Sequence, residues 1–315
     1  MGKLKALLLT EGMHGMISQV EGMAKALKTE YSHKIIRLNF PWNFVPPKIS
    51  PVSEIILKDK IYITKNEAPD LIISCGRKSV IPSIFLKKKN PKLFTIHIQN
   101  PKVDFKNFDA IVAPEHDNLN GDNIYSSKGA IHYITDLEIN EAKSYLNNKI
   151  SSKKIVTLIL GGPNKYYSFE KQQLFKIFNE IKSNFISKGY KVIIIPSMRT
   201  PKKIIEFATQ EMKEFGHVVN TVDKQAYLSG YALANFIVVT CDSTSMISEA
   251  ATSGKPIFIA HMNPKKNNYR FKRFFKLFKE MGITRDLGQK IENWEYNKYN
   301  EAERIGNIIK DKIKN

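Results

Sequence analysis

The sequence predicts an α/β protein made of two Rossmann-like domains whose parallel sheets face one another across a cleft. Short apolar runs alternate with helical patterns along the whole chain, which is typical of parallel sheets covered by helices. A length of 315 residues leaves room for two domains. The two halves also echo each other, because residues 71–83 and 236–248 share the order strand, cysteine, polar turn and helix.

The first half predicts six strands and three helices before a polar stretch. The proline-rich residues 39–51 are expected to form a loop. A further helix is expected from Asp136 to about residue 146, and the polar residues 147–153 then indicate a linker, so the first domain is residues 1–150. The predicted strands are 6–9, 34–38, 71–74, 93–97, 110–113 and 131–134, and the predicted helices are 16–28, 53–65 and 79–87.

The second half, residues 151–315, again alternates predicted strands and helices and forms the second domain. The last 50 residues have helical patterns with a loop near 282–290, and the final helix is expected to cross back to the first domain. The predicted strands are 155–160, 192–195, 218–220, 236–240 and 256–260, and the predicted helices are 169–187, 201–214, 224–234 and 245–253.

Composition excludes several classes of function. No apolar run approaches the roughly 18–20 residues that span a bilayer. The apolar stretch at the N-terminus is too short for a signal peptide and no small-residue cleavage site follows it, so we expect a cytoplasmic protein. The formal charge is +19, yet only 7 of the 49 basic residues are arginine, which argues against a nucleic-acid partner. Cys75 and Cys241 each end a predicted strand in a different domain, so neither a disulfide nor a zinc site is expected.

The most informative segment follows the strand at 236–240. Ser243, Thr244 and Ser245 place hydroxyls beside the first free amides of a helix, where the dipole attracts an anion. Glu249 lies four residues after Ser245 on the same face, where its carboxylate could hold a ribose. The alternative is an ordinary N-cap by the preceding Asp242 or by Ser243, with Glu249 in solvent.

Two other strand ends of the second domain carry candidate donor-binding residues. Gly161 and Gly162, followed by Asn164, suit a phosphate or sugar that approaches the main chain. Arg199 follows the next strand, where its guanidinium could grip a diphosphate; the alternative is a surface arginine. The convergence of three loops on one sheet edge favours a nucleotide ligand.

The first domain offers candidates for general-base chemistry. His116 and Asp117 follow a predicted strand, and such a pair can deprotonate a sugar hydroxyl, although a structural pair is the more common case. The loop after the first strand contains Gly12 and Gly15, without a dinucleotide fingerprint. Rival bases are His14, His97, Glu11 and Glu115.

Residues 265–280 predict an amphipathic helix. Phenylalanines fall on one stripe and basic residues largely outside it. We expect a helix packed on its sheet with a solvated basic face. The alternative is a contact with an anionic membrane.

These motifs resemble a known family. The segment 243–256 resembles the ribose-binding helix of GT-B nucleotide-sugar glycosyltransferases. The whole chain is similar to the mitochondrial-fission "elongated mitochondria" family of glycosyltransferase-like proteins, whose bacterial members include lipooligosaccharide outer-core transferases. The shared positions are Gly12, Gly15, Gln19, Gly76, Arg77, Phe108, Asp109, Pro114, His116, Asp117, Gly161, Gly162, Pro163, Ser197, Arg199, Thr200, Pro201, Asp242, Ser243, Ser245, Met246, Glu249, Gly254, Lys255, Pro256, Gly282 and Arg285.

The resemblance implies a GT-B fold and transfer of a sugar from a nucleotide diphosphate sugar to a cell-envelope acceptor, either lipopolysaccharide or lipid-linked. The second domain would bind the donor, with no metal and no cofactor, in agreement with the absence of a D-x-D motif. Peripheral contact with an anionic membrane is a further expectation. By this resemblance the donor would be held by Gly161, Gly162, Asn164, Arg199, Ser243, Thr244, Ser245 and Glu249, the base would be His116 with Asp117 or His14, and the acceptor side would be lined by Gly12, Gly15 and Gln19.

One departure and two rival functions accompany this interpretation. Bacterial members often carry aspartate at the place of Glu11 and histidine at the place of Met16, so a base at the latter position would be missing here. The rival functions are a nucleotide-sugar 2-epimerase on the same fold and a non-enzymatic membrane adaptor.

Overall fold

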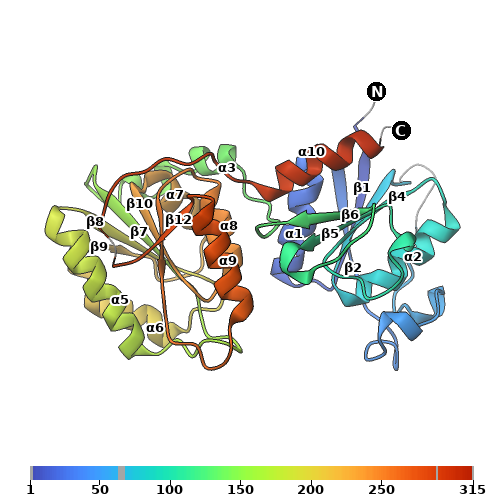
Figure 1. Cartoon of the computed structure of the whole chain (residues 1–315), viewed down its shortest axis with the longest axis horizontal. Helices are drawn as coiled ribbons and strands as arrows, with labels where there is room; N and C mark the ends of the chain where they lie inside the picture. The colour runs from blue at the N-terminus through green and yellow to red at the C-terminus, as the bar shows by residue number, and fades with distance from the viewer. Residues whose placement is uncertain (1–2, 63–67, 289, 314–315) are drawn as a thin grey trace. The chain divides into compact units, whose positions relative to one another are not determined.

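A computed structural model of the chain describes residues 3–62, 68–288 and 290–313 (Figure 1). The chain divides into unit 1, which is Met1–Tyr133 with Glu301–Asn315, and unit 2, which is Ile134–Asn300. Each unit contains a six-stranded sheet in which every ladder is parallel. The predicted α/β class with two parallel sheets is therefore confirmed.

The sheet of unit 1 has the strand order β2-β1-β3-β4-β5-β6. The chain leaves β1 toward one side and returns on the other side at β3, so the carboxyl ends of β1 and β3 flank the topological switch point, where ligands bind in such sheets. The strands are β1 Lys5–Thr10, β2 Glu30–Ile35, β3 Leu71–Cys75, β4 Phe94–Ile98, β5 Ala110–Pro114 and β6 Ile124–Ser127.

Helices cover both faces of this sheet. The helices α1 (His14–Ala26) and α10 (Glu301–Ile313) share one apolar core with it, and α2 (Val80–Lys89) belongs to the core on the opposite face. The final helix thus lies within unit 1. Gly306 permits its close approach to α1, because a Cβ there would lie 2.7 Å from the Cβ of Ala26.

Three predicted elements of unit 1 were wrong. The strand predicted at 34–38 is β2, which begins four residues earlier; it is an exposed edge strand, so its sequence has little apolar signal. The strand predicted at 131–134 does not exist, and β6 precedes it. The helix predicted at 53–65 is only a 3-10 turn at Glu54–Ile56, because the chain there pairs back through Leu57 to Leu38; residues 63–65 of that prediction lie outside the described residues.

The sheet of unit 2 has the order β12-β11-β10-β7-β8-β9, with its switch point between β7 and β10. The apolar runs of β7 and β10 are buried throughout, and both strands have their predicted bounds. The short edge strand β12 lies in the segment predicted to be a loop. The strands are β7 Ile155–Leu160, β8 Lys191–Pro196, β9 Gly216–Val218, β10 Phe236–Thr240, β11 Ile257–Ala260 and β12 Thr284–Asp286.

The segment 134–150 packs in unit 2, although the predicted boundary places it in the first domain. The amide of Leu146 donates to Oγ of Ser229 at 3.0 Å, which ties this segment to α7. The helices of unit 2 are α3 Asp136–Glu141, α4 Ser144–Asn147, α5 Lys171–Asn184, α6 Lys202–Met212, α7 Lys224–Leu233, α8 Thr244–Ala251 and α9 Tyr269–Glu280.

The apolar stripe of α9 is part of the packing of unit 2. Phe274, Phe275 and Phe278 are buried, and Phe271 is partly buried with edge contacts to Tyr166 and Tyr167. The helix is therefore a packed domain helix whose basic face is exposed. Within the described ranges, no helix has the length and apolar content that crossing a bilayer requires.

Candidate functional site

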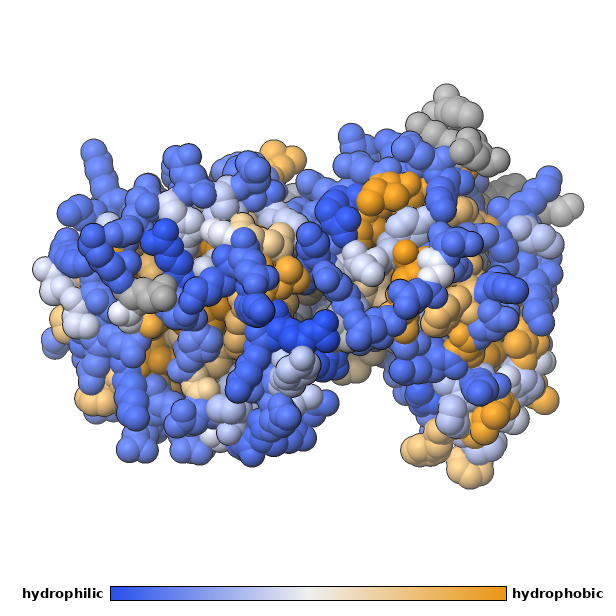
Figure 2. Space-filling view, viewed as in Figure 1, coloured by the Kyte–Doolittle hydropathy of each residue, from blue (hydrophilic) through white to orange (hydrophobic). Residues whose placement is uncertain are grey.

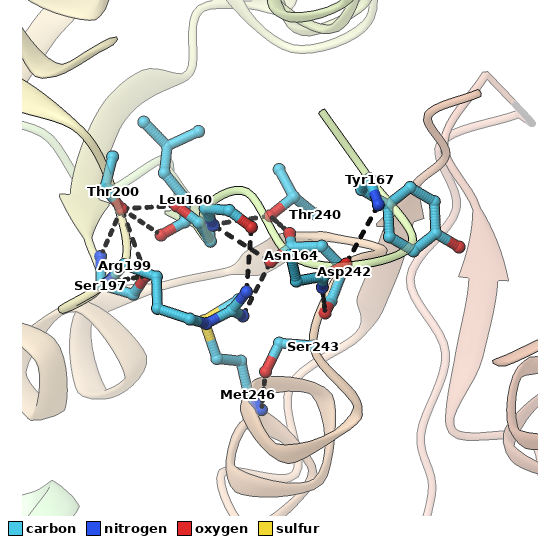
Figure 3. A network of polar contacts seen from close by, with 12 residues as sticks. Leu160, Asn164, Tyr167, Ser197, Arg199, Thr200, Thr240, Asp242, Ser243 and Met246 are labelled. Carbon is cyan, nitrogen blue, oxygen red and sulfur yellow. Dashed lines mark hydrogen bonds and ion pairs between the residues drawn. The ribbon is translucent and has the colours of Figure 1, made fainter. Parts of the chain in front are cut away.

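The loops after β7, β8 and β10 meet at the carboxyl edge of the unit 2 sheet, beside its switch point (Figure 3). At their centre, Nη2 of Arg199 lies 2.8 Å from Oδ2 of Asp242. The guanidinium also donates from Nη1 to the carbonyl of Gly162 at 2.9 Å. One arginine therefore joins all three loops.

The Asp242 carboxylate is buried and has several donors. Its Oδ2 accepts a hydrogen bond from the amide of Gly162 at 3.0 Å, in addition to the bond from Arg199, and its Oδ1 accepts from Oγ1 of Thr240 at 2.7 Å. Burial raises the pKa of this carboxyl, while Arg199 and the hydrogen bonds from Thr240 and Gly162 oppose that rise. Asp242 thus orients the arginine and is not the cap of α8.

The paired glycines are required by this network. A Cβ on Gly161 would lie 2.1 Å from Oδ2 of Asp242, and a Cβ on Gly162 would lie 2.0 Å from the carbonyl oxygen of Arg199. No side chain fits in either position. The glycine pair that the sequence assigned to ligand approach is therefore explained first by the close packing of protein groups.

Asn164 is also engaged within the protein. Its Nδ2 donates to the carbonyl of Asp242 at 3.0 Å. Its Oδ1 accepts from the amides of Tyr166 and Tyr167 at 2.7 and 3.0 Å. The side chain fixes the loop after β7 against the start of α8.

The start of α8 keeps free backbone donors. Ser243 is the N-cap, and its Oγ accepts from the amide of Met246 at 3.4 Å. Within the described part of the chain, the amides of Thr244 and Ser245 have no hydrogen-bond partner. Two unpaired amides at a helix N-terminus favour an anionic ligand.

Arg199 has donor capacity left over. A guanidinium carries five N–H donors, of which the ion pair and the Gly162 contact use two. The side chain is 40% exposed, so the remaining donors are reachable from solvent. The arginine is held in one orientation by a buried carboxylate, which suits bidentate recognition of phosphate oxygens.

Glu249 is not in free solvent. It is partly buried, and its Oε2 accepts a hydrogen bond from the hydroxyl of Tyr227 at 2.6 Å. Burial raises the pKa of this carboxyl to about 7, and the Tyr227 bond opposes that shift. It lies six residues beyond the Ser243 cap, about 9 Å along the helix axis. Among the described residues no hydrogen bond joins it to the Arg199–Asp242 pair.

The switch point of unit 1 contains a second charged pair. Oε1 of Glu11, after β1, accepts from the amide of Lys78 at 3.1 Å, and Nζ of Lys78 lies 3.3 Å from Oε2. Gly76 has a positive φ of 93°, and a Cβ there would lie 2.7 Å from Sδ of Met16. Met16 therefore packs at this edge.

The acceptor-side candidates lie on and before α1. His14 is exposed in the first turn, and Gly15 has no atom within 4 Å of the Cβ position, so its surroundings are open. Gly12 precedes them with a φ of 84°. Oε1 of Gln19 accepts from Sγ of Cys75 at 3.3 Å and from Nε2 of Gln99 at 3.3 Å, so that side chain is engaged at the ends of β3 and β4.

The remaining base candidates differ in accessibility. His116 lies in the 3-10 turn Glu115–Asp117 after β5, and its side chain is outside the described part of the structure. Asp117 is partly buried in the same turn. His97 is buried with Nδ1 2.9 Å from Oγ of Ser74, and burial lowers its pKa to about 3, so it stays neutral and enclosed.

Sequence reasoning missed Tyr227 and the role of Asp242 as the partner of Arg199. Tyr227 lies in the middle of α7, where nothing in the local sequence marks it. No group of three histidine, cysteine, aspartate or glutamate side chains able to hold a metal occurs within the ranges that the structure describes.

Solved structures with the same two-sheet architecture identify the fold. The UDP-GlcNAc 2-epimerase of Methanocaldococcus jannaschii is 16% identical with a TM-score of 0.52, and the match covers 97% of this chain and 99% of that chain. A UDP-glucosyltransferase of Polygonum tinctorium is 9% identical with a TM-score of 0.50 and coverages of 99% and 90%. The fold of this chain is therefore GT-B.

Sequence comparisons give the family. The uncharacterized protein RP120 of Rickettsia prowazekii (strain Madrid E) is 28% identical over 338 aligned positions, which cover 95% of this chain and 94% of that protein. The mitochondrial fission protein ELM1 of Arabidopsis thaliana is 24% identical over 280 positions, which cover 79% of this chain but only 65% of the plant protein. A sequence model of the family described as mitochondrial fission ELM1 matches residues 14–313. With its GT-B fold and a match over nearly its whole length, the chain belongs to the mitochondrial fission ELM1 family.

Proposed function

We propose that this protein transfers a sugar from a nucleotide diphosphate sugar to a cell-envelope acceptor, either lipopolysaccharide or a lipid-linked glycan. The observation that carries the proposal is the fixed guanidinium of Arg199 beside the uncapped amides of Thr244 and Ser245. This combination of a cation and a positive helix end suits a diphosphate. The structural neighbours named above are UDP-sugar enzymes, which supports a nucleotide-sugar ligand.

The donor would lie at the carboxyl edge of unit 2. Arg199 and the start of α8 would hold the diphosphate, and Glu249, six residues deeper in the helix, would accept hydrogen bonds from the ribose hydroxyls. When the bond between the anomeric carbon and the diphosphate oxygen breaks, the bonding electrons leave with the nucleotide diphosphate. The same donors would stabilise the negative charge that develops on it.

The acceptor would be activated by a base from unit 1. His116 with Asp117, or alternatively His14, would take the proton of the acceptor hydroxyl as its oxygen bonds to the anomeric carbon. Gly12, Gly15 and Gln19 would line the acceptor side. Cytoplasmic placement with peripheral contact at a membrane belongs to the same proposal.

Calorimetry with UDP, GDP and ADP sugars tests the donor assignment, with a CMP sugar, which has a single phosphate, for comparison. We expect one of the diphosphate sugars to bind, and we expect Arg199→Ala and Glu249→Ala to weaken that binding by at least about tenfold, because each removes a hydrogen bond in which one group is charged. Lys202→Ala, an exposed change in the same unit, serves as the matched control. Absence of binding by every sugar, or unchanged affinity in Glu249→Ala, would overturn the proposal.

Two rival functions are separated by further measurements. The Methanocaldococcus neighbour is a UDP-GlcNAc 2-epimerase, which favours nucleotide-sugar 2-epimerisation as the first rival. Such an enzyme would alter the sugar with no acceptor present, which NMR of a donor-only mixture would detect. The second rival is a non-enzymatic membrane adaptor; the Arabidopsis relative is a mitochondrial fission protein. An adaptor would keep its partner binding after loss of both Arg199 and Glu249.

A further inference from the structure

One segment of unit 1 exposes large apolar side chains in close succession. Phe40, Phe44, Ile49 and Ile55 are 82%, 76%, 71% and 69% exposed. Single exposed apolar residues are ordinary, but four such side chains within residues 40–55 expose apolar area whose contact with water is unfavourable, which is typical of an interaction surface. We call residues 39–57 the apolar loop. Figure 1 shows it as a blue excursion that projects from the edge of unit 1, and Figure 2 shows apolar side chains at the same corner.

The apolar loop is a built structure. Ile56 and Leu57 are buried at one end of the loop, and Trp42 packs on the core of unit 1 near the other end. Nδ2 of Asn39 donates to the carbonyls of Ile55 and Leu57 at 3.1 and 3.0 Å. The exposed apolar tips are therefore held outward by a fixed frame.

The frame is joined to the switch point of unit 1. Arg77 follows β3, and its guanidinium donates to the carbonyls of Asn43 and Val45 within the apolar loop. A ligand surface contacted by the loop would thus lie next to the edge that carries the acceptor-side candidates.

The charges on and beside the loop indicate that its partner is anionic. Its acidic neighbours are neutralised, since Glu54 pairs with Lys89 at 3.9 Å and Asp59 with Arg37 at 2.8 Å. In contrast, the exposed Lys48, Lys58 and Lys60 have no carboxylate partner among the residues that the structure describes. The whole chain carries a formal charge of +19. Apolar tips flanked by these exposed lysines are complementary to an anionic lipid surface.

We propose that the apolar loop docks this protein on anionic membranes by inserting Phe40, Phe44, Ile49 and Ile55 into the lipid interface while the lysines bind the headgroups. The membrane contact is thus assigned to the apolar loop and not to α9, because the apolar stripe of α9 is buried and cannot reach a lipid surface. The docking itself does not depend on the proposed function. Its role does: docking would hold the acceptor-side edge of unit 1 at the membrane surface where a lipid-linked acceptor resides.

Co-sedimentation with vesicles tests the docking. The full chain should bind vesicles of phosphatidylglycerol with phosphatidylethanolamine and should bind phosphatidylcholine vesicles much less. The triple variant Phe40→Ser, Phe44→Ser, Ile49→Ser should lose at least about tenfold in partition coefficient, since the inserted apolar area is removed. The triple variant Lys48→Gln, Lys58→Gln, Lys60→Gln should lose the preference for anionic lipid.

A matched control uses exposed apolar residues of unit 2. Phe175→Ser with Leu137→Ser, which are 44% and 66% exposed, should leave the partition coefficient unchanged. Thermal unfolding of all variants should match the parent, because the changed side chains lie at the surface. A second readout uses fluorescence, since the chain has two tryptophans and Trp294→Phe leaves Trp42 of the loop alone. Brominated lipids should then quench Trp42 upon vesicle binding.

Three outcomes would overturn the proposal: no binding of the parent chain to anionic vesicles, equal binding by the serine variant, or a dimer in light scattering that the serine variant dissolves, which would assign the loop to a second copy of the chain. Nucleotide-sugar calorimetry and vesicle binding, both measured on the parent chain, keep the two hypotheses apart. Vesicle binding without donor binding would sink the proposed function alone, and donor binding without vesicle binding would sink the docking alone.

Discussion

The guanidinium of Arg199 and the carboxylate of Asp242 form a 2.8 Å ion pair between residues 43 positions apart in the chain. Asp242 is fully buried, whereas Arg199 is partly open to solvent. The carboxylate therefore serves as an internal anchor, and the arginine keeps donors for an external anion. This asymmetry is the basis of the first prediction.

Arg199→Ala should lower the free energy of unfolding by about 3 kcal/mol near pH 8, because it leaves a buried carboxylate without its cation. The loss should be smaller near pH 5. Burial already raises the pKa of Asp242, and without Arg199 that carboxyl takes up a proton more readily. Urea unfolding at both pH values measures the difference. Lys202→Ala should change stability by less than about 0.5 kcal/mol, and an equal effect of both variants would contradict the assignment.

Gly161→Ala and Gly162→Ala should each cost at least about 2 kcal/mol, because the added Cβ would overlap Asp242 or the main chain of Arg199. The matched control is Gly15→Ala, where nothing lies within 4 Å of the new atom. Since Gly15 lies in α1, that variant should be unchanged or more stable by up to about 1 kcal/mol. Denaturant unfolding of the three variants decides; similar behaviour at positions 15 and 161 would refute the packing argument.

Glu249→Gln should stabilise the protein increasingly as the pH rises from about 5 to about 8. The pKa of Glu249 is raised from 4.5 to about 7 in the folded chain. The folded state thus binds this proton more tightly than the unfolded state, and the associated stability is lost as pH rises toward the folded value. Glutamine stays neutral and keeps an acceptor for Tyr227.

The expected gain of this variant at pH 8 is about 1–2 kcal/mol, less than full linkage, because the side chain is partly exposed. Calorimetric melting across the pH range measures it. A gain that is constant with pH would show that Glu249 does not titrate in this window.

Donor binding should not depend on a divalent metal, because Arg199 and the start of α8 would supply the positive charge for the diphosphate. Calorimetry in EDTA should give a Kd within about twofold of that in magnesium. A Kd that rises tenfold or more in EDTA would contradict the metal-free site.

Donor binding should also be tighter above about pH 7 than at pH 6, since ribose hydroxyls donate to an ionised Glu249. The same calorimetric titration, repeated at both pH values, measures the difference.

Much of the fold could be predicted because central parallel strands are buried on both faces. The continuous apolar runs of β7 and β10 marked them at their observed bounds. Edge strands lack this signal: β2 reads EYSHKI and is mostly exposed, and β12 has three residues. Segment 134–150 illustrates the same limit, since its position depends on contacts with α7, among them the bond from Leu146 to Ser229, and not on its own composition.

The sequence could predict where the candidate site lies, but it could not predict which hydrogen bonds and ion pairs join its residues. Glycines, hydroxyls and an arginine at strand ends indicated the carboxyl edge of unit 2. Nothing local indicated that the glycines make room for Asp242, or that Tyr227 binds Glu249. The site roles of His116, Asp117, His14 and the acceptor-side residues stay predictions.

By itself, the sequence determined the alternation of strands and helices, the family and the sheet edges where ligands are expected, because these depend on local periodicity and on residues close together in the chain. Only the tertiary structure decided which groups neutralise one another and which apolar residues stay outside. It buried the phenylalanine stripe of α9 and left Phe40 and Phe44 in solvent, although both sets are equally apolar. Burial and pairing are properties of contacts between distant segments, so they are fixed only when the sheets and helices pack.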